Sequence, residues 1–237
     1  MSINKCKGIV INKYDLNEAD RLLTVFTEKK GKSVFIIKGI RKSKKREKYG
    51  SDILVYSSFV YYERNNHKTV SSLEIIEPFL QIKNDYFKIN ICFYILKIIN
   101  QILIEGEDRK ELFERTLKSL NYIQREERKS KIYVMLMYYL YKLIEEEGLN
   151  IEVIYDGEYF DFENGLLGAK SKNIGVKLET YEKKLFHCLN KVDINGVFEL
   201  KLEGNKLIKC ILILEKYLIY HTKISICFKD LITNRNS

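Results

Sequence analysis

Two hydrophobic periods divide the chain at about residue 80. Up to that point, short runs of β-branched and aromatic residues alternate with turn-forming residues, as in β-strands. Gly31 can adopt the positive φ of a tight turn between two of these runs. Five strands in so short a segment predict a small barrel of the oligonucleotide-binding (OB) type. The predicted strands are residues 6–11, 21–27, 32–37, 53–62 and 69–76.

Beyond residue 80 the period becomes helical. Apolar residues recur every three or four positions, which predicts amphipathic helices. Ser130 is expected to cap the third of them, and Gly148 to end it. Residues 149–175 interrupt the pattern, because turn residues alternate with aromatics there, and this predicts a small β-like insertion. The predicted helices cover residues 85–102, 112–123, 131–147, 179–189 and 206–223.

These elements predict an α+β protein with two domains. Residues 1–80 form a five-stranded OB-fold β-barrel, and residues 81–237 form a helical domain with a small irregular insertion at about 149–175. The single proline, Pro78, marks the end of the barrel. At 46% hydrophobic and 31% charged residues, the chain is neither disordered nor membrane-embedded. No apolar run approaches the roughly 20 residues of a membrane span, and no signal-peptide core is seen, so a cytoplasmic protein is expected.

Positive charge is concentrated in the predicted barrel. Residues 1–80 contain 16 Lys and Arg against 9 Asp and Glu, whereas the whole chain has a net charge of +9. Much of the excess lies in a basic tract, residues 38–48 (KGIRKSKKREK), between the third and fourth strands. Concentrated positive charge on a small β-rich module indicates a polyanionic ligand, above all nucleic acid. The alternative is a solvated loop whose charges only keep the protein soluble.

Aromatic residues follow the basic tract and are candidates for stacking on bases. Because side chains alternate along a strand, only some of them can face outward. They are Tyr49, Tyr56, Phe59, Tyr61 and Tyr62.

Motifs of catalysis are not found, and we expect no enzymatic activity. Gly31-Lys32-Ser33 matches the end of a phosphate-binding P-loop, but Phe26 stands where the leading glycine belongs. The three histidines have no triad or metal spacing, and the run Glu145-Glu146-Glu147 spreads around a helix end, so it cannot converge on one ion. The five cysteines are scattered without a C-x-x-C pair, as is usual for cysteines that fill cores.

Several segments resemble the bacterial DNA repair protein family RecO. The most specific are residues 7–11 (KGIVI), residues 17–27 (NEADRLLTVFT) and the segment from Lys38 to Lys42 (KGIRK), which is similar to the basic loop of the family. Weaker similarities extend the resemblance over essentially the whole chain. They are residues 143–148 (LIEEEG), 159–167 (YFDFENGLL) and 218–221 (LIYH).

The resemblance implies a function in recombinational DNA repair without enzymatic turnover. Members of the family bind single- and double-stranded DNA and anneal complementary strands. Together with RecR they help to load RecA onto strands coated by the single-stranded DNA-binding protein (SSB), whose acidic, hydrophobic C-terminal tail they recognise. The resemblance also implies a cytoplasmic, nucleoid-associated protein.

One departure from the family pattern concerns zinc. Many relatives carry four cysteines in the insertion, whereas this chain has none there, and Gly168 stands about where the second pair would begin. A closed structural zinc site needs four ligands. We therefore expect no metal or other cofactor, and an insertion held by the packing of its aromatics Tyr155, Tyr159, Phe160 and Phe162.

Two sites are expected from charge and resemblance together. The first binds DNA phosphates through the cations of the basic tract, with Arg21 and Lys32 as lesser contributors. The second, for the SSB tail, needs an apolar groove beside a cation, for which Lys142 is the candidate; the alternative is an ordinary exposed lysine on a helix. The cations of the tract are Lys38, Arg41, Lys42, Lys44, Lys45, Arg46 and Lys48.

Two other functions fit the same features. An OB-type RNA-binding module in translation or RNA processing would share the charge and the barrel, but would prefer structured RNA to single-stranded DNA. A scaffold whose basic tract docks an acidic protein would show partner binding with little salt-sensitive affinity for DNA.

Overall fold

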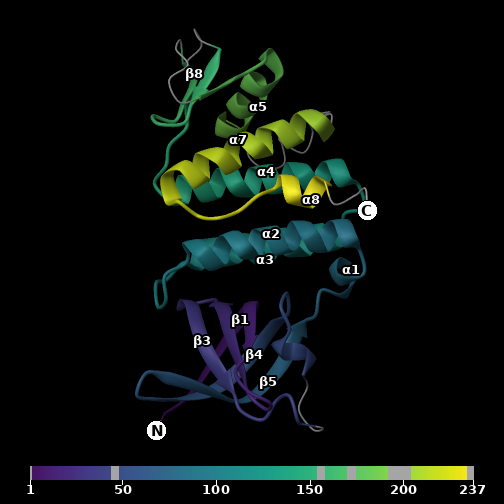
Figure 1. Ribbon diagram of the computed structural model, residues 1–237, viewed down its shortest axis with the longest axis vertical. Helices are drawn as coiled ribbons and strands as arrows, with labels where there is room; N and C mark the ends of the chain where they lie inside the picture. The colour runs from purple at the N-terminus through teal and green to yellow at the C-terminus, as the bar shows by residue number, and fades with distance from the viewer. Residues whose placement is uncertain (1, 44–47, 154–157, 170–174, 192–203, 234–237) are drawn as a thin grey trace. The chain divides into compact units, whose positions relative to one another are not determined.

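The computed structural model describes residues 2–43, 48–153, 158–169, 175–191 and 204–233 (Figure 1). Three cations of the basic tract, Lys44, Lys45 and Arg46, lie outside these residues, as does Tyr155 of the insertion. The chain forms two compact units, Met1–Gln124 and Arg125–Ser237.

The first unit is built on a closed five-stranded barrel with the strand order β1-β2-β3-β5-β4. Strand β3 pairs with β5 in parallel, through Ile36 and Thr69, and all other neighbours are antiparallel. This confirms the predicted OB-fold barrel and the α+β class. The strands are β1 (Ser2–Asp15), β2 (Arg21–Thr27), β3 (Gly31–Ile37), β4 (Tyr56–Arg64) and β5 (His67–Glu77).

Strand β1 is longer than its apolar run predicts, because it pairs with two different strands along its length. Its first half pairs with β4 and its second half with β2, and a register shift between Val10 and Asn12 lies in the second half. Strand β4 begins three residues later than predicted. Leu54, in a left-handed conformation (φ 63°), precedes it, and the Leu54 amide donates to the Val10 carbonyl at 2.9 Å.

The barrel core consists of the inward-facing side chains of alternating strand positions. Phe35 stacks on Phe59 with ring centroids 5.7 Å apart and meets the ring of Tyr61 edge-on at 5.0 Å. Of the five aromatics that follow the basic tract, Tyr56, Phe59 and Tyr61 are therefore buried, and only Tyr49 and Tyr62 are partly exposed. The core residues are Val10, Leu23, Val25, Phe35, Ile37, Ile40, Phe59, Tyr61 and Val70.

Three helices complete the first unit: α1 (Leu80–Lys83), α2 (Tyr86–Ile102) and α3 (Lys110–Arg125). Asp85 caps α2, since its carboxylate accepts hydrogen bonds from the first free amides of the helix. The ring of Phe113 on α3 contacts Phe26 at 5.2 Å and Tyr56 at 6.1 Å. The change from strands to helices thus falls near residue 80, as expected, whereas the compact unit continues to Gln124 because these helices pack on the barrel.

The second unit pairs helices with a small sheet. Helix α4 packs against α7, and the sheet has the order β6-β8-β7-β9. Helix α4 begins at Lys129 after Arg128, so Ser130 lies inside the helix and the expectation that it is the cap is wrong. The elements are α4 (Lys129–Glu146), β6 (Glu152–Val153), β7 (Tyr159–Asp161), β8 (Leu166–Ala169), β9 (Gly175–Lys177), α5 (Thr180–Lys191), α7 (Gly204–Thr222) and α8 (Lys229–Thr233).

Aromatic packing anchors the sheet of the insertion. Phe160 is fully buried and contacts the rings of Phe162, Phe186 and Tyr217 at centroid distances of 5.3, 6.1 and 5.3 Å. The Phe162 carbonyl also lies 2.9 Å from His221 Nε2 on α7. Among the described residues, no three His, Cys, Asp or Glu side chains gather as metal ligands would. Residues 149–175 contain no cysteine, so they lack the four thiolate ligands of the zinc site that the resemblance implies.

We expect the purified protein to contain no stoichiometric zinc, because the insertion has no cysteine ligands, and we expect the aromatic contacts to support it instead. Elemental analysis measures this directly, and a thermal unfolding curve that is the same with and without EDTA is the second expected result. One zinc per chain, or a melting temperature that EDTA lowers, would contradict the prediction.

Two further expectations concern membranes and cysteines. Along the described helices, no segment combines the length and the hydrophobicity of a membrane span. Cys92 and Cys210 are buried, as expected of cysteines that fill cores, whereas Cys227 is exposed. Burial raises the pKa of the Cys210 thiol to about 12.

Candidate nucleic-acid interface

The basic tract starts where β3 ends and leads to a short 3₁₀ helix, η1 (Tyr49–Ser51), before β4. Lys38, Arg41, Lys42 and Lys48 are all exposed there. The structure thus brings these four predicted residues into one loop at one end of the barrel. Lys44, Lys45 and Arg46 belong to the same loop in sequence but lie outside the described residues.

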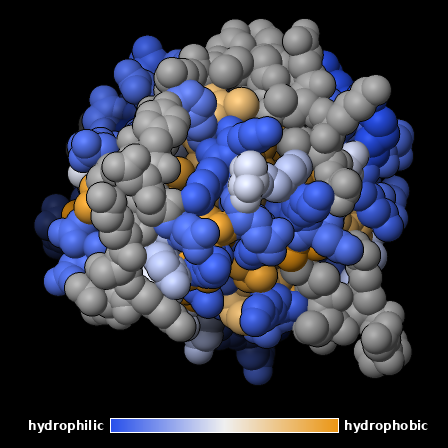
Figure 2. Space-filling model, turned by 90° about the horizontal axis from the view of Figure 1, so that it is seen from above, coloured by the Kyte–Doolittle hydropathy of each residue, from blue (hydrophilic) through white to orange (hydrophobic). Residues whose placement is uncertain are grey.

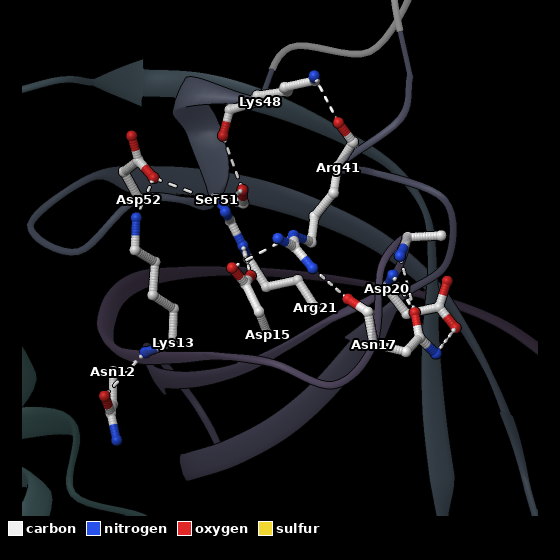
Figure 3. Close-up of polar contacts among 11 residues, drawn as sticks. Asn12, Lys13, Asp15, Asn17, Asp20, Arg21, Arg41, Lys48, Ser51 and Asp52 are labelled. Carbon is white, nitrogen blue, oxygen red and sulfur yellow. Dashed lines mark hydrogen bonds and ion pairs between the residues drawn. The ribbon is translucent and has the colours of Figure 1, made fainter.

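The first turn of this loop is held by the β1–β2 connection (Figure 3). The Asp20 carboxylate accepts a hydrogen bond from the Gly39 amide at 2.8 Å, and the Arg41 amide donates to the Ala19 carbonyl at 3.0 Å. Asn17 supports the connection by accepting from the Asp20 amide at 2.8 Å. The Gly39 hydrogen bond, followed by that from Asn17, holds the pKa of Asp20 below its ordinary value. Gly39 itself has a positive φ of 68°, which favours glycine.

Arg41 acts as a clamp within the loop. Its guanidinium donates to the Asn17 carbonyl and pairs with Asp15 at 3.3 Å, and Lys48 Nζ donates to the Arg41 carbonyl at 2.7 Å (Figure 3). Arg41 therefore links the beginning of the tract to the β1–β2 connection and to the end of the tract. A phosphate would meet a cation that already orders the loop.

Lys42 is different, because the carboxylate with which it pairs is exposed. It pairs with Glu18 at 2.7 Å, with side chains that are 63% and 88% exposed. Exposed ion pairs of this kind contribute about 0–1 kcal/mol. Lys42 can therefore exchange the carboxylate for a phosphate at little cost.

Arg21 lies beneath the tract and is largely neutralised by carboxylates. Its side chain is 14% exposed and contacts Asp15 at 2.9 Å, Ser51 at 2.8 Å and Asp52 at 3.4 Å (Figure 3). The hydrogen bond from Arg21 is the main cause of the lowered pKa of Asp15. The geometry makes Arg21 a support of the loop, since it joins the end of β1 to η1.

Lys32 is separated from the tract by the length of β3. Its Nζ donates to the Asn100 carbonyl at 2.7 Å, in the last turn of α2, where a cation stabilises the helix end. Six residues of a strand, at about 3.3 Å each, place it roughly 20 Å from Lys38. The structure therefore does not bring Lys32 together with the other predicted cations.

Two further cations at this end of the barrel were missed from the sequence. Lys13 Nζ pairs with Asp52 at 2.6 Å, and Lys83 Nζ lies 4.2 Å from the ring centroid of Tyr49 and 3.0 Å from its hydroxyl. Lys83 belongs to α1, and no pattern in the sequence connects it with the tract. Its partner Tyr49 is thus held by a cation–π contact of the kind that stabilises aromatic side chains at a surface.

A pH series offers a test of the Lys83 contact. Burial lowers the pKa of Lys83 from 10.5 to about 8, so the unfolded chain binds this proton more tightly than the folded one. The free energy of unfolding should therefore rise between pH 8 and 10 by more in the wild type than in K83M. Urea unfolding of both proteins at pH 7, 8, 9 and 10 measures the difference, in which contributions from groups remote from Lys83 cancel. Parallel curves would contradict a half-buried Lys83 with a lowered pKa.

Lys142, the candidate for the SSB tail, pairs with a residue of its own helix. Its Nζ lies 2.6 Å from Glu145, with side chains 29% and 36% exposed. Figure 2 shows a face on which hydrophilic residues predominate, with hydrophobic ones singly between them. The exposed large apolar side chains among the described residues all belong to the first unit. These side chains are Ile3, Tyr14, Leu16, Ile76, Leu80, Tyr86, Phe93 and Ile104. The apolar groove beside Lys142 stays a prediction.

Comparison with known proteins agrees with this architecture. Residues 1–79 match the family model "Recombination protein O N terminal". A protein of Acetivibrio thermocellus named DNA repair protein RecO is 33% identical over 128 residues, which are 54% of this chain and 51% of that protein. A relative of the same name from Clostridium acetobutylicum is 24% identical over 216 residues, 86% of this chain and 87% of the relative.

A third relative, DNA repair protein RecO of Alkaliphilus metalliredigens, is 29% identical over 145 residues. The matched region spans about half the length of the first and third relatives, 51% and 58%, and most of the second. The family model covers the OB barrel that carries the basic tract, and the second relative matches most of the chain. The barrel thus matches the N-terminal domain of the RecO family, and most of the chain is similar to proteins named DNA repair protein RecO.

Proposed function

We propose that this protein is a recombination mediator in DNA repair that binds single- and double-stranded DNA and anneals complementary strands without catalysing a reaction. The observation that carries the proposal is the basic loop at one end of an OB barrel, which hydrogen bonds and ion pairs hold to the β1–β2 connection. Lys38, Arg41, Lys42 and Lys48 emerge there together, next to the half-buried ring of Tyr49. DNA binding would place the protein at the nucleoid in the cytoplasm.

Annealing follows from charge neutralisation. Two complementary strands repel each other through their phosphates, and cations that bind both backbones reduce this repulsion. Binding of this kind releases counterions and needs no readout of the sequence, so complementary strands of any sequence can be paired. The loop needs only to present cations within reach of the backbone.

The partners in the proposal rest on the family resemblance. With RecR, the protein would help to load RecA onto single-stranded DNA coated by SSB, and it would recognise the C-terminal tail of SSB. A relative that matches this chain over 87% of its own length is named a DNA repair protein, which supports this role.

Strand annealing across a salt series tests the proposal. If about six phosphates are neutralised, the logarithm of the DNA affinity should fall with the logarithm of the salt concentration at a slope near −4 to −5. Labelled complementary oligonucleotides should anneal rapidly, also when coated with SSB, and more slowly as salt rises. A folded protein that does not anneal them would contradict the proposal, and a preference for structured RNA would favour the RNA-binding alternative.

A further inference from the structure

A second group of cations surrounds a cavity of about 340 Å³ at the other end of the barrel strands. It lies between the N-terminal half of β1 and the turn that joins β2 to β3, and we name it the β1–turn groove. Its lining residues are Asn4, Lys5, Cys6, Lys7, Thr27, Glu28, Lys29, Lys30 and Tyr61.

The groove exists because β1 changes its neighbour. Gly8 pairs with Thr27 at the end of β2, whereas the preceding residues pair only with β4. The start of β1 therefore runs beyond the end of β2, beside residues 28–30 of the turn. The seven residues of β2, at about 3.4 Å each, place this groove roughly 24 Å from the basic tract at the other end of the strand.

Four exposed lysines flank the groove, and they differ from the cations of the tract in their partners. Among the described residues, no carboxylate pairs with the amines of Lys5, Lys7, Lys29 or Lys30. The one carboxylate of the groove, Glu28, accepts a hydrogen bond from the Tyr56 hydroxyl instead. Four cations around one cavity, with the single acid engaged elsewhere, make a site for an anion.

The floor of the groove is uncharged. Tyr61 is 2% exposed and Thr27 also 2%, and burial raises the pKa of the Cys6 thiol to about 11, so it stays protonated at neutral pH. A neutral floor between exposed cations suits a ligand with an apolar or aromatic part and a negatively charged part. The cavity volume lies at the lower end of the about 300–1,000 Å³ that is usual for small-molecule sites.

We propose that the β1–turn groove holds one nucleotide of a single strand, with the base against the half-buried Cys6 and the flanking phosphates on the four lysines. The inference rests on the proposed function and adds a second DNA contact to it. A single strand fits because its bases are unpaired and can enter a cavity, whereas the bases of a duplex are stacked inside it. Contacts at both ends of the barrel would keep a bound strand extended along the protein.

Removal of the four charges tests the groove. In the variant K5Q/K7Q/K29Q/K30Q, the salt slope for an oligothymidylate should become less steep by up to about 3, because each lost contact to a single strand changes it by about 0.7. Affinity for a duplex should change much less. The control K97Q/K118Q/K184Q/K216Q loses the same charge from exposed helix positions and should keep the slope. Thermal unfolding shows whether both variants are folded.

Cross-linking then locates the strand. An oligothymidylate that contains 4-thiothymidine should cross-link, on irradiation, to residues 4–7 or 27–30, as peptide mass spectrometry would show. Cross-links confined to the basic tract, with an unchanged slope in the groove variant, would overturn the groove but leave the proposed function intact. No binding of the oligothymidylate to the wild type would overturn both. Loss of acidic-peptide binding, but not of DNA binding, in the groove variant would make the groove a peptide site.

Discussion

Reversal of four charges in the basic tract, K38E/K42E/K44E/K45E, should abolish strand annealing and lower the affinity for single-stranded DNA by about 100-fold or more. A hydrogen bond to a charged group contributes about 1.5–3 kcal/mol, so the loss of only two phosphate contacts accounts for this factor. Arg41 is left in place because it binds Asp15 and the Asn17 carbonyl, and its loss would disturb the loop itself.

The measurement is annealing of labelled oligonucleotides together with fluorescence anisotropy at several salt concentrations. The matched control, K97E/K118E/K184E/K216E, changes the net charge by the same amount at exposed lysines on four helices and should still anneal. The thermal unfolding of both variants should resemble that of the wild type. Intact annealing in the tract variant would rule out this loop as the DNA site, and equal losses in both variants would show that only net charge matters.

Replacement of Gly31 by alanine should lower the free energy of unfolding by about 4 kcal/mol, the largest effect on stability that we expect from a single methyl group. Gly31 has a positive φ of 51°, which costs other residues about 1–2 kcal/mol. A Cβ would also lie 1.9 Å from the Glu107 carbonyl oxygen, a backbone atom that cannot swing away. To relieve this overlap, the turn must move away from the connection between α2 and α3. Overpacking of this kind typically costs about 1–3 kcal/mol.

Gly39 is the matched control for Gly31. It has a similar φ of 68°, but nothing lies within 4 Å of an added Cβ. Gly39→Ala should therefore cost only the conformational term of about 1–2 kcal/mol. Urea unfolding followed by far-ultraviolet circular dichroism measures both variants. Equal losses would show that the approach of Glu107 to Gly31 contributes nothing.

Local patterns in the sequence predicted the architecture well. Alternation and turn residues identified the five strands, because one face of each strand must be buried, and the helical period identified the main helices. The ends of elements were predicted less well. The polar flanks of β1 carry exposed side chains such as Lys5 and Lys13, yet their backbone is paired, and side-chain polarity does not report backbone pairing.

The candidate site was predicted in part. Clustered lysines and arginines in the sequence located the loop, since contiguous residues of a loop stay together in any fold. The roles of Arg21 and Lys32 could not be predicted, because their partners Asp52 and Asn100 come from distant segments. The contact of Lys83 with Tyr49 could not be predicted for the same reason, since the two residues are 34 positions apart in the chain.

The sequence by itself determined the class of the fold, the place of the excess charge and the absence of cysteines from the insertion, since each depends on residue type and local period. Only the tertiary structure decided which cations support the loop and which remain exposed to a ligand. It also revealed the groove beside the start of β1, where Lys5 and Lys7 meet Lys29 and Lys30 across a change of strand partner. Such sites depend on pairing between segments far apart in the chain, and no local pattern encodes that pairing.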